Sequence, residues 1–234
     1  MKISGLQKNS LIDFPGEISC VLFTNGCNFI CPYCHNPEIA GGSSSGTATL
    51  IEEQEIFSFL EKRKNLLNGV VITGGEPTLH KDLDFFCYRI KKMGYKIKLD
   101  TNGSNPKVLE DLYKKELVDF TAMDIKSNLK NYHLAAGKNF NPDCIIASIK
   151  LIMERSPLYE FRTTCVKPFL DTKIICDIGN MIQGASHYVL QHCSKDVKML
   201  TPDFFKQKNR FFSDNEIIDF SHQVEKYVKK CSIR

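Results

Sequence analysis

The sequence lacks any long hydrophobic run: no segment approaches the roughly 18 consecutive apolar residues that a membrane-spanning helix requires. Residues 1–10 contain no apolar stretch of signal-peptide length either. We therefore expect a cytoplasmic protein without a membrane partner. Neither sign of charge dominates, because 31 basic and 27 acidic residues are spread along the chain and give a formal net charge of +4. No basic stripe of the kind that binds nucleic acid is present, so we expect no nucleic-acid partner.

Cysteine is too scarce for a disulfide scaffold, at ten in 234 residues, but more abundant than packing requires in a reduced protein. Clustered thiols in a reducing compartment are more often metal ligands or catalysts than disulfides. The composition, 42% hydrophobic and 25% charged, is typical of a globular protein with a full core. We expect a single domain over residues 1–234, with a core at about 16–195 and a C-terminal helical extension at about 200–234.

Short runs rich in β-branched and aromatic residues alternate with stretches of helical periodicity, which favours parallel βα units. The expected strands are Ile18–Thr24, Val70–Thr73, Lys96–Thr101, Phe120–Asp124, Phe161–Val166 and Tyr188–Gln191. The expected helices are Ile51–Leu67, Leu83–Met93, Pro106–Lys115, Pro142–Glu154, Thr172–Gln183 and, near the C-terminus, Asp214–Lys230. Six such strands form either a partial barrel or an open doubly wound sheet, and periodicity does not distinguish the two.

Groups of unusual residues directly follow the predicted strands. These groups are Asn25–Cys34, Gly74–Pro77, Thr101–Gly103, Asp124–Lys126 and Gln191–Cys193. In parallel α/β proteins the loops after the strands converge on one edge of the sheet, where binding and catalytic residues collect. The sequence therefore predicts one active face.

Cys27, Cys31 and Cys34 form a CxxxCxxC motif, with His35 next to it. Three thiolates within eight residues can hold one metal centre, and thiolate ligands select iron–sulfur clusters or zinc. A structural zinc site needs four protein ligands, and none of the other seven cysteines forms a CxxC pair. With three ligands a [4Fe–4S] cluster keeps one iron open, whereas a fourth ligand such as Cys193 would close it. A non-catalytic zinc-binding interaction module is the alternative of another class.

A buried strand runs into the paired glycines of the motif Gly74-Gly75-Glu76-Pro77. Glycines let backbone groups approach a ligand with no Cβ in the way, and Glu76 adds a carboxylate. Taken alone, the motif could also be only a tight turn.

The CxxxCxxC loop after the first predicted strand, with GGEP after the second, resembles the radical S-adenosylmethionine (SAM) superfamily. The stretches GLQK and SLIDFPG in residues 5–16, and FTNGCNF and CPYCHNP in residues 23–37, are similar to anaerobic ribonucleoside-triphosphate reductase activating proteins. These are glycyl-radical activases related to the pyruvate formate-lyase activating enzyme. The similarity is dense over residues 5–37, 70–79 and 99–103, and elsewhere covers only the order of the elements.

The resemblance implies a partial (β/α)6 barrel in which Cys27, Cys31 and Cys34 hold three irons of a [4Fe–4S] cluster and SAM chelates the fourth. Reductive cleavage of SAM gives methionine and a 5′-deoxyadenosyl radical. In an activase that radical takes a hydrogen atom from a backbone glycine of a partner, here anaerobic (class III) ribonucleotide reductase. Reduced flavodoxin or ferredoxin is the implied electron donor. Alternatives within the superfamily are another glycyl-radical enzyme as partner, or a small molecule such as a deazapurine precursor.

The resemblance also implies which residues contact SAM. Tyr33 matches the position of an aromatic ring beside the adenine. Gly74, Gly75 and Glu76 match the motif that binds the SAM amino group. His192, after the last predicted strand, matches the place where several activases have a residue that touches SAM.

Asp100 and Asp124 end two of the predicted strands. Two carboxylates brought together repel each other unless a cation lies between them, and either Lys126 or a bound metal ion could be that cation. Related activases carry DTNG and D-x-K motifs here, which implies that Asp100, Thr101, Asp124 and Lys126 contact SAM. It also implies a monovalent cation and a catalytic part for Lys126. The alternative is a turn at residues 102–103 and a solvated ion pair.

Overall fold

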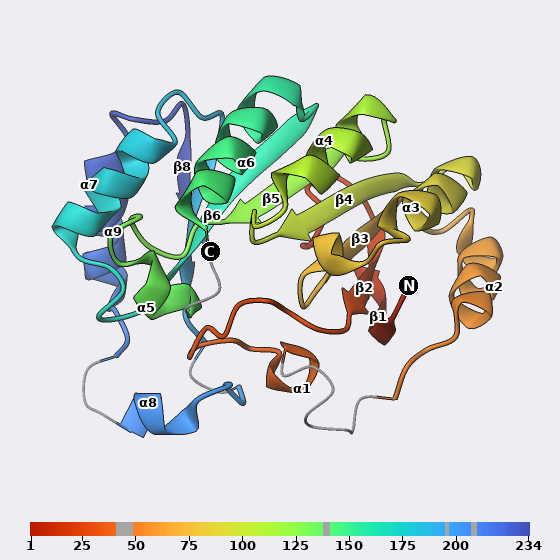
Figure 1. Ribbon diagram of the computed structural model, residues 1–234, viewed down its shortest axis with the longest axis horizontal. Helices are drawn as coiled ribbons and strands as arrows, with labels where there is room; N and C mark the ends of the chain where they lie inside the picture. Colours follow the sequence, from red (N-terminus) through yellow and green to blue (C-terminus); the bar gives the residue numbers. More distant parts are fainter. Residues whose placement is uncertain (41–48, 138–140, 195–196, 207–209) are drawn as a thin grey trace.

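The computed structural model of the protein describes residues 1–40, 49–137, 141–194, 197–206 and 210–234, and one eight-stranded sheet organises it (Figure 1). The strands lie in the sheet in the order in which they occur along the chain. They are β1 (Ile3–Ser10), β2 (Ser19–Thr24), β3 (Gly69–Gly74), β4 (Lys96–Thr101), β5 (Phe120–Asp124), β6 (Leu158–Cys165), β7 (Tyr188–His192) and β8 (Cys231–Ile233). The first strand is antiparallel to the second, and all later neighbours are parallel.

Helices cover the outer face of the sheet and its carboxyl edge (Figure 1). They are α1 (Pro37–Ala40), α2 (Glu53–Arg63), the 3₁₀ turn η2 (Pro77–Leu79), α3 (Leu83–Lys92), α4 (Pro106–Lys114), α5 (Tyr132–Ala136), α6 (Pro142–Arg155), α7 (Thr172–Met181), α8 (Pro202–Lys206) and α9 (Asp214–Val224). The short helices α1, α5 and α8 lie along the edge where the parallel strands end. No helix in the described ranges is long and apolar enough to cross a lipid bilayer.

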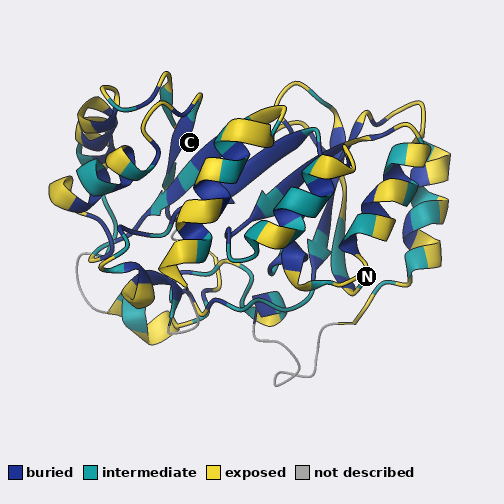
Figure 2. Ribbon diagram, turned by 45° about the horizontal axis from the view of Figure 1, so that its top comes forward, coloured by how far each residue is buried: buried dark blue, intermediate teal, exposed yellow. Residues whose placement is uncertain are grey.

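The hydrophobic core is divided between the two faces of the sheet. The larger part lies between the strands and the outer helices, which expose only their outward sides to solvent (Figure 2). A smaller cluster covers the other, inner face; its members are Phe14, Val21, Val71, Phe120 and Ala122. Strands buried on both faces read as continuous apolar runs, which explains the Val70–Ile72 segment of β3.

Proline and side-chain caps set the beginnings of several helices. Pro106 and Pro142 occupy the first turns of α4 and α6, where a missing N–H is not needed. The Asp171 carboxylate accepts a hydrogen bond from the backbone N–H of Ile174 and caps α7.

The six predicted strands are confirmed, with the predicted bounds for β4 and β5. Two strands were not predicted. The edge strand β1 carries Gln7, Lys8 and Asn9 on exposed backbone, so it lacks the apolar alternation that marks a half-buried strand. The strand β8 has only three residues.

The C-terminal segment differs from the predicted helical extension. The helix expected over Asp214–Lys230 ends at Val224, and the chain then turns back to form β8 beside β7. The described part of residues 200–234 therefore contains two helices and a strand that extends the main sheet.

The strand order distinguishes a partial barrel from an open doubly wound sheet, the two architectures that the sequence allowed. A doubly wound sheet reverses its strand order at a switch point and has helices on both faces. Here the order runs from β1 to β8 without reversal, and the long helices lie on one face. The fold is the expected partial barrel, and it is not closed, because β1 and β8 form its two edges.

Candidate active site

A cavity of about 370 Å³ lies at the carboxyl ends of the parallel strands. Its volume is within the range of small-molecule sites. Its walls come from the loops after β2, β3, β4 and β5 and from β6 and β7, as the prediction of one active face requires. The predicted site residues that line it are Cys27, Cys31, Tyr33, Cys34, Gly74, Gly75, Glu76, Asp100, Thr101, Asp124 and Lys126.

The three cysteines of the CxxxCxxC motif all line this cavity as free thiols. The backbone N–H of Cys34 donates to the carbonyl of Cys31 at 3.0 Å, which closes a turn and brings the motif back on itself. Burial raises the pKa of the Cys27 thiol to about 11 and that of Cys31 to about 12. A bound metal cation would deprotonate such thiols outright.

The motif supplies three thiols, one fewer than the four protein ligands of a structural zinc site. No group of three His, Cys, Asp or Glu side chains in the described ranges is gathered closely enough to hold one metal ion. A tetrahedral zinc, bound at about 2.3 Å to each thiolate, would require sulfur atoms within about 4 Å of one another. An iron–sulfur cluster holds its thiolates farther apart, because each binds a different iron.

The glycines of the GGEP motif are required by close approach of the chain to itself. Gly74 has φ +110°, and a Cβ on Gly75 would lie 1.9 Å from the carbonyl oxygen of Gly26. The backbone N–H of Glu76 donates to that same oxygen at 2.8 Å. The two motifs therefore pack directly on each other, a contact that the sequence reasoning did not foresee.

Glu76 is buried, and its carboxylate joins the loops after β3 and β4. It accepts hydrogen bonds from the hydroxyls of Thr78 (2.6 Å) and Thr101 (2.8 Å) and from the backbone N–H of Asn102 (2.6 Å). Burial raises the pKa of Glu76, although these donors oppose the shift. The carboxylate thus anchors the two loops while its own residue lines the cavity.

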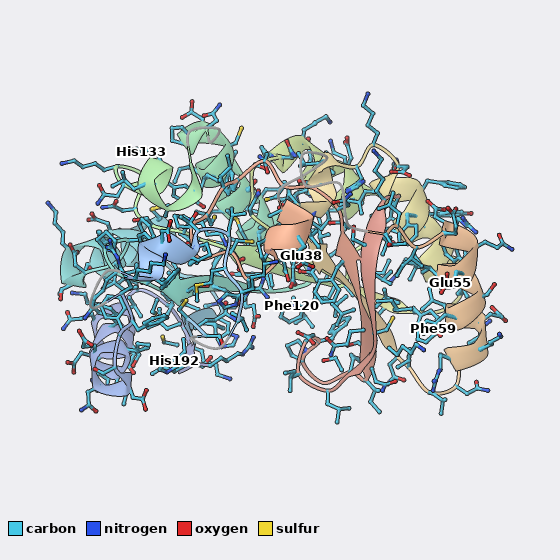
Figure 3. All side chains as sticks on the ribbon, turned by 90° about the horizontal axis from the view of Figure 1, so that it is seen from below. Glu38, Glu55, Phe59, Phe120, His133 and His192 are labelled. Carbon is cyan, nitrogen blue, oxygen red and sulfur yellow. The ribbon has the colours of Figure 1, made fainter. Side chains whose placement is uncertain are left out.

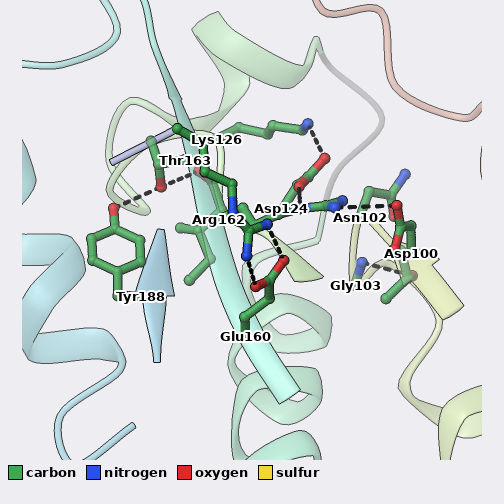
Figure 4. Close-up of polar contacts among 12 residues, drawn as sticks. Asp100, Asn102, Gly103, Asp124, Lys126, Glu160, Arg162, Thr163 and Tyr188 are labelled. Carbon is green, nitrogen blue, oxygen red and sulfur yellow. Dashed lines mark hydrogen bonds and ion pairs between the residues drawn. The ribbon is translucent and has the colours of Figure 1, made fainter. Parts of the chain in front are cut away.

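Arg162 of β6 is the cation that lies between the two predicted carboxylates (Figure 4). Its Nε donates to Asp124 at 2.8 Å and its Nη1 to Asp100 at 3.1 Å. The ammonium of Lys126 pairs with Asp124, at 2.9 Å, and the buried Lys98 pairs with Asp100. The prediction that Lys126 lies between the carboxylates was wrong, because the register of β5 on β6 places Asp124 directly opposite Arg162. The alternative of a bound metal ion stays a prediction.

The charges in this network determine the protonation of the acids. Burial alone would raise the pKa of Asp124, but Arg162 and Lys126 outweigh it and hold that pKa well below its usual range. Arg162 and Lys98 lower the pKa of Asp100 in the same way. Both carboxylates are therefore ionised, and the ammonium of Lys126 is charged, because Asp124 more than offsets the effect of burial on its pKa.

Tyr33 provides a polar atom without a protein partner. Its ring is buried against Phe169, with 5.6 Å between the ring centroids. Its hydroxyl is buried and makes no hydrogen bond to any described residue. Because an unpaired buried hydroxyl costs free energy, the hydroxyl of this cavity-lining residue fits a position beside a polar ligand.

His192 does not line the cavity. Its side chain is 39% exposed and lies 3.9 Å from the carboxylate of Asp214 at the start of α9, as its place beside that helix in Figure 3 shows. Its neighbour Gln191 lines the cavity instead. Cys193, considered as a fourth ligand, lies outside the lining and has its sulfur 3.8 Å from His35.

Comparison with known proteins identifies the class. Residues 21–166, more than half of the chain, match the radical SAM superfamily. Together with the parallel sheet and the three-thiol loop, this match shows that the chain belongs to that superfamily. The protein is a radical SAM oxidoreductase, and the cofactors of its family are a [4Fe–4S] cluster and SAM.

The relatives narrow the class further. The chain is 32% identical over 238 residues to the Methanocaldococcus jannaschii protein named "Putative glycyl-radical enzyme activating enzyme", covering 99% of this chain and 95% of that one. It is 28% identical over 169 residues to the pyruvate formate-lyase-activating enzyme of Listeria monocytogenes, covering 68% and 66%. Among solved structures, Streptococcus suis SuiB bound to S-adenosylmethionine superposes with a TM-score of 0.66 at 16% identity, covering 92% of this chain and 51% of that one. This last likeness concerns the fold alone.

The residues of the cavity fit the family's two cofactors. The three thiols can bind three irons of a cluster. Polar contacts to SAM, with its zwitterionic amino acid part, are available from the hydroxyl of Tyr33 and the charged groups of Asp100, Asp124 and Lys126. Gly74 and Gly75 also line the cavity, and their lack of a Cβ lets this loop pack against the backbone of residues 23–26.

Proposed function

We propose that the protein is a glycyl-radical activase whose partner is anaerobic (class III) ribonucleoside-triphosphate reductase. The observation that carries the proposal is one cavity lined by the three-thiol loop, the GGEP motif and the Asp100–Arg162–Asp124 network. Similarity over nearly the full length to a protein named as an activating enzyme supports the activase class. Similarity of residues 5–37 to reductase activating proteins favours this partner.

Each group of residues has a distinct part in the proposed reaction. Cys27, Cys31 and Cys34 hold the cluster, and Tyr33 packs beside the adenine of SAM. When bound, the reduced cluster would give one electron to SAM and so supply methionine and a 5′-deoxyadenosyl radical, which would take a hydrogen atom from the partner's glycine. The protein orients the cofactors and excludes water from the radical.

The site has to bind SAM and also to admit the loop of the partner that carries the reactive glycine. Gly74, Gly75 and Glu76 receive the amino group, and Asp100, Thr101, Asp124 and Lys126 surround the rest of the SAM molecule. The barrel is open between β1 and β8, so a protein loop can enter its inner side without unfolding either chain. Reduced flavodoxin or ferredoxin supplies the electron, and the reaction takes place in the cytoplasm.

The test is anaerobic reconstitution of the protein with iron and sulfide, followed by incubation with SAM, reduced flavodoxin and the reductase. We expect SAM cleavage and a glycyl signal in the electron paramagnetic resonance spectrum of the reductase. The Cys31→Ala variant should lose both cluster and SAM cleavage, because one of three ligands is removed.

Pyruvate formate-lyase, offered in place of the reductase, is the matched control. A glycyl signal on this enzyme alone would reject the proposed partner and keep the activase class. Consumption of a small molecule with no radical on either protein would reject the activase class itself.

A further inference from the structure

The side chain of Asn102 connects the loop after β4 to the thiol of Cys27. It is buried, and its backbone N–H donates to Glu76 at 2.6 Å. Its side-chain Nδ2 donates to Asn28 Oδ1 at 2.9 Å and to Cys27 Sγ at 3.9 Å. Asn102 therefore contacts both the GGEP motif and the three-thiol loop.

The orientation of the Asn102 amide is fixed by its neighbours. Its Oδ1 accepts a hydrogen bond from the backbone N–H of Ser104 at 2.9 Å, so the nitrogen must be the atom that faces the thiol loop. One of the two N–H groups is used by Asn28, which leaves the other for Cys27. The same sulfur also accepts from the backbone N–H of Phe29 at 3.4 Å.

We propose that Asn102 is a positioning residue that raises the reduction potential of the cluster through the Cys27 thiolate. This inference rests on the proposed function only in taking Cys27 as a cluster ligand. Reduction adds negative charge to the cluster and its thiolates, and an N–H group aimed at a sulfur stabilises that charge. Hydrogen bonds to the sulfurs are among the features by which proteins set cluster potentials.

The hydrogen bond from the backbone N–H of Asn102 to Glu76 holds the side-chain amide of Asn102 in place beside Cys27. The backbone N–H of Asn102 is held by the Glu76 carboxylate, which also binds Thr78 and Thr101. The amide is thereby fixed relative to the motif that receives the SAM amino group. The Glu76 carboxylate thus helps to set the distance from the amide of Asn102 to Cys27.

The test compares the midpoint potentials of reconstituted Asn102→Leu and unaltered protein, measured by redox titration followed by electron paramagnetic resonance of the reduced cluster. Hydrogen bonds to charged groups are stronger than those between neutral groups, and only the part of this strength that differs between the two oxidation states of the cluster moves the potential. We therefore expect the variant to be harder to reduce by on the order of tenfold, a shift of about 59 mV to more negative potential.

Asn105→Leu is the matched control. Asn105 lies three residues further on, and its amide donates to Thr78 rather than to a sulfur, so its variant should keep the original potential. Iron content is measured in every sample. Failure of the unaltered protein to assemble a cluster would reject the assignment of the three cysteines as ligands. An unchanged potential in a loaded variant would instead reject the role of Asn102.

Asn102→Asp keeps the shape of the side chain and the acceptor for Ser104, but replaces the N–H groups with an oxygen. It provides a second measurement if the leucine variant holds no cluster. The same direction of shift is expected. A potential equal to that of the unaltered protein in either loaded variant would overturn the proposal.

Discussion

Arg162 shows, at the scale of single residues, what the sequence could and could not predict about the site. The three cysteines and the GGEP motif were found because each is contiguous in the sequence. Arg162 is one of two charged residues in β6, with Glu160, and only strand register brings it opposite Asp124. The charge of Arg162 inside a predicted strand indicated that this residue has a buried partner. The sequence does not show which residues those partners are.

Removing this cation should destabilise the protein strongly. In Arg162→Met, Asp100 and Asp124 lose the group that lies between them, and breaking a buried ion pair from one side costs about 3–5 kcal/mol. Denaturant unfolding of the cofactor-free protein measures the loss. Lys198→Met is the control, since Lys198 and its partner Glu38 are both well exposed and their pair is worth under about 1 kcal/mol. Equal stabilities of the two variants would contradict the role of Arg162.

The difference between the unaltered protein and Arg162→Met should also depend on pH. Asp100 and Asp124 have folded-state pKa values below the unfolded value of about 3.9, so the stability that they contribute is complete above about pH 4. That contribution is lost as the pH falls further and the carboxylates become protonated. The gap in unfolding free energy between the two proteins should therefore be constant near neutral pH and shrink below pH 4.

At the scale of elements, the segment that carries α8 supports the three-thiol loop from outside. The backbone N–H groups of Leu200 and Thr201 donate to the carbonyls of Cys34 (3.2 Å) and Pro32 (3.1 Å). The ring of Phe204 stacks on Phe169 at 5.4 Å, and Phe169 in turn packs on Tyr33. This support could not be predicted from the sequence, because it depends on residues about 170 positions apart along the chain.

Removing the Phe204 ring should loosen this support. In Phe204→Ala we expect a loss of roughly 1–2 kcal/mol, because the ring is only half-buried. Hydrogen exchange at the amides of Leu200 and Thr201 should become faster. Phe205→Ala removes a similar ring that does not contact Phe169, so it should leave these amides protected. Equal exchange in the two variants would show that stacking on Phe169 does not hold the segment.

The central strands were predicted from short runs that contain buried apolar residues. The strands β4 and β5 were predicted with their observed bounds, although three of the six residues of β4 are charged. The predicted helix at Ile51 began too early, because Ile51 instead forms an antiparallel bridge with Ile3. Such a bridge depends on a strand, β1, that has too few apolar residues to be recognised.

At the scale of the whole molecule, the last strand is tied to the inner wall of the barrel. Arg234 follows β8 and forms two hydrogen bonds to Glu160 of β6, at 2.9 and 2.7 Å, across the intervening β7. Glu160 is fully buried, and His187 lies 3.6 Å from the same carboxylate. The fold of residues 16–195 could be predicted from the sequence, whereas this attachment could not, because a three-residue strand carries no periodicity.

Breaking the attachment should weaken the whole sheet. In Arg234→Met the buried Glu160 loses its bidentate partner, and we expect a loss of about 1–3 kcal/mol in the free energy of unfolding. The double variant Glu160→Gln, Arg234→Met removes the charge as well, so it should recover part of the loss. A double variant whose loss relative to the unaltered protein equals the sum of the two single losses would indicate that the two residues do not interact.

The strands have the same order in the sheet as along the chain, and this order affects how the protein can fold while it is being translated. Each parallel strand joins the one made just before it, so a chain leaving the ribosome can add strands one at a time without waiting for a distant partner. The three-thiol loop follows β2, whereas Arg162, Leu200 and Thr201 are made much later. During translation the thiols are thus exposed before the groups that secure their surroundings exist, and delivery of iron and sulfide is best matched to the released, completed chain.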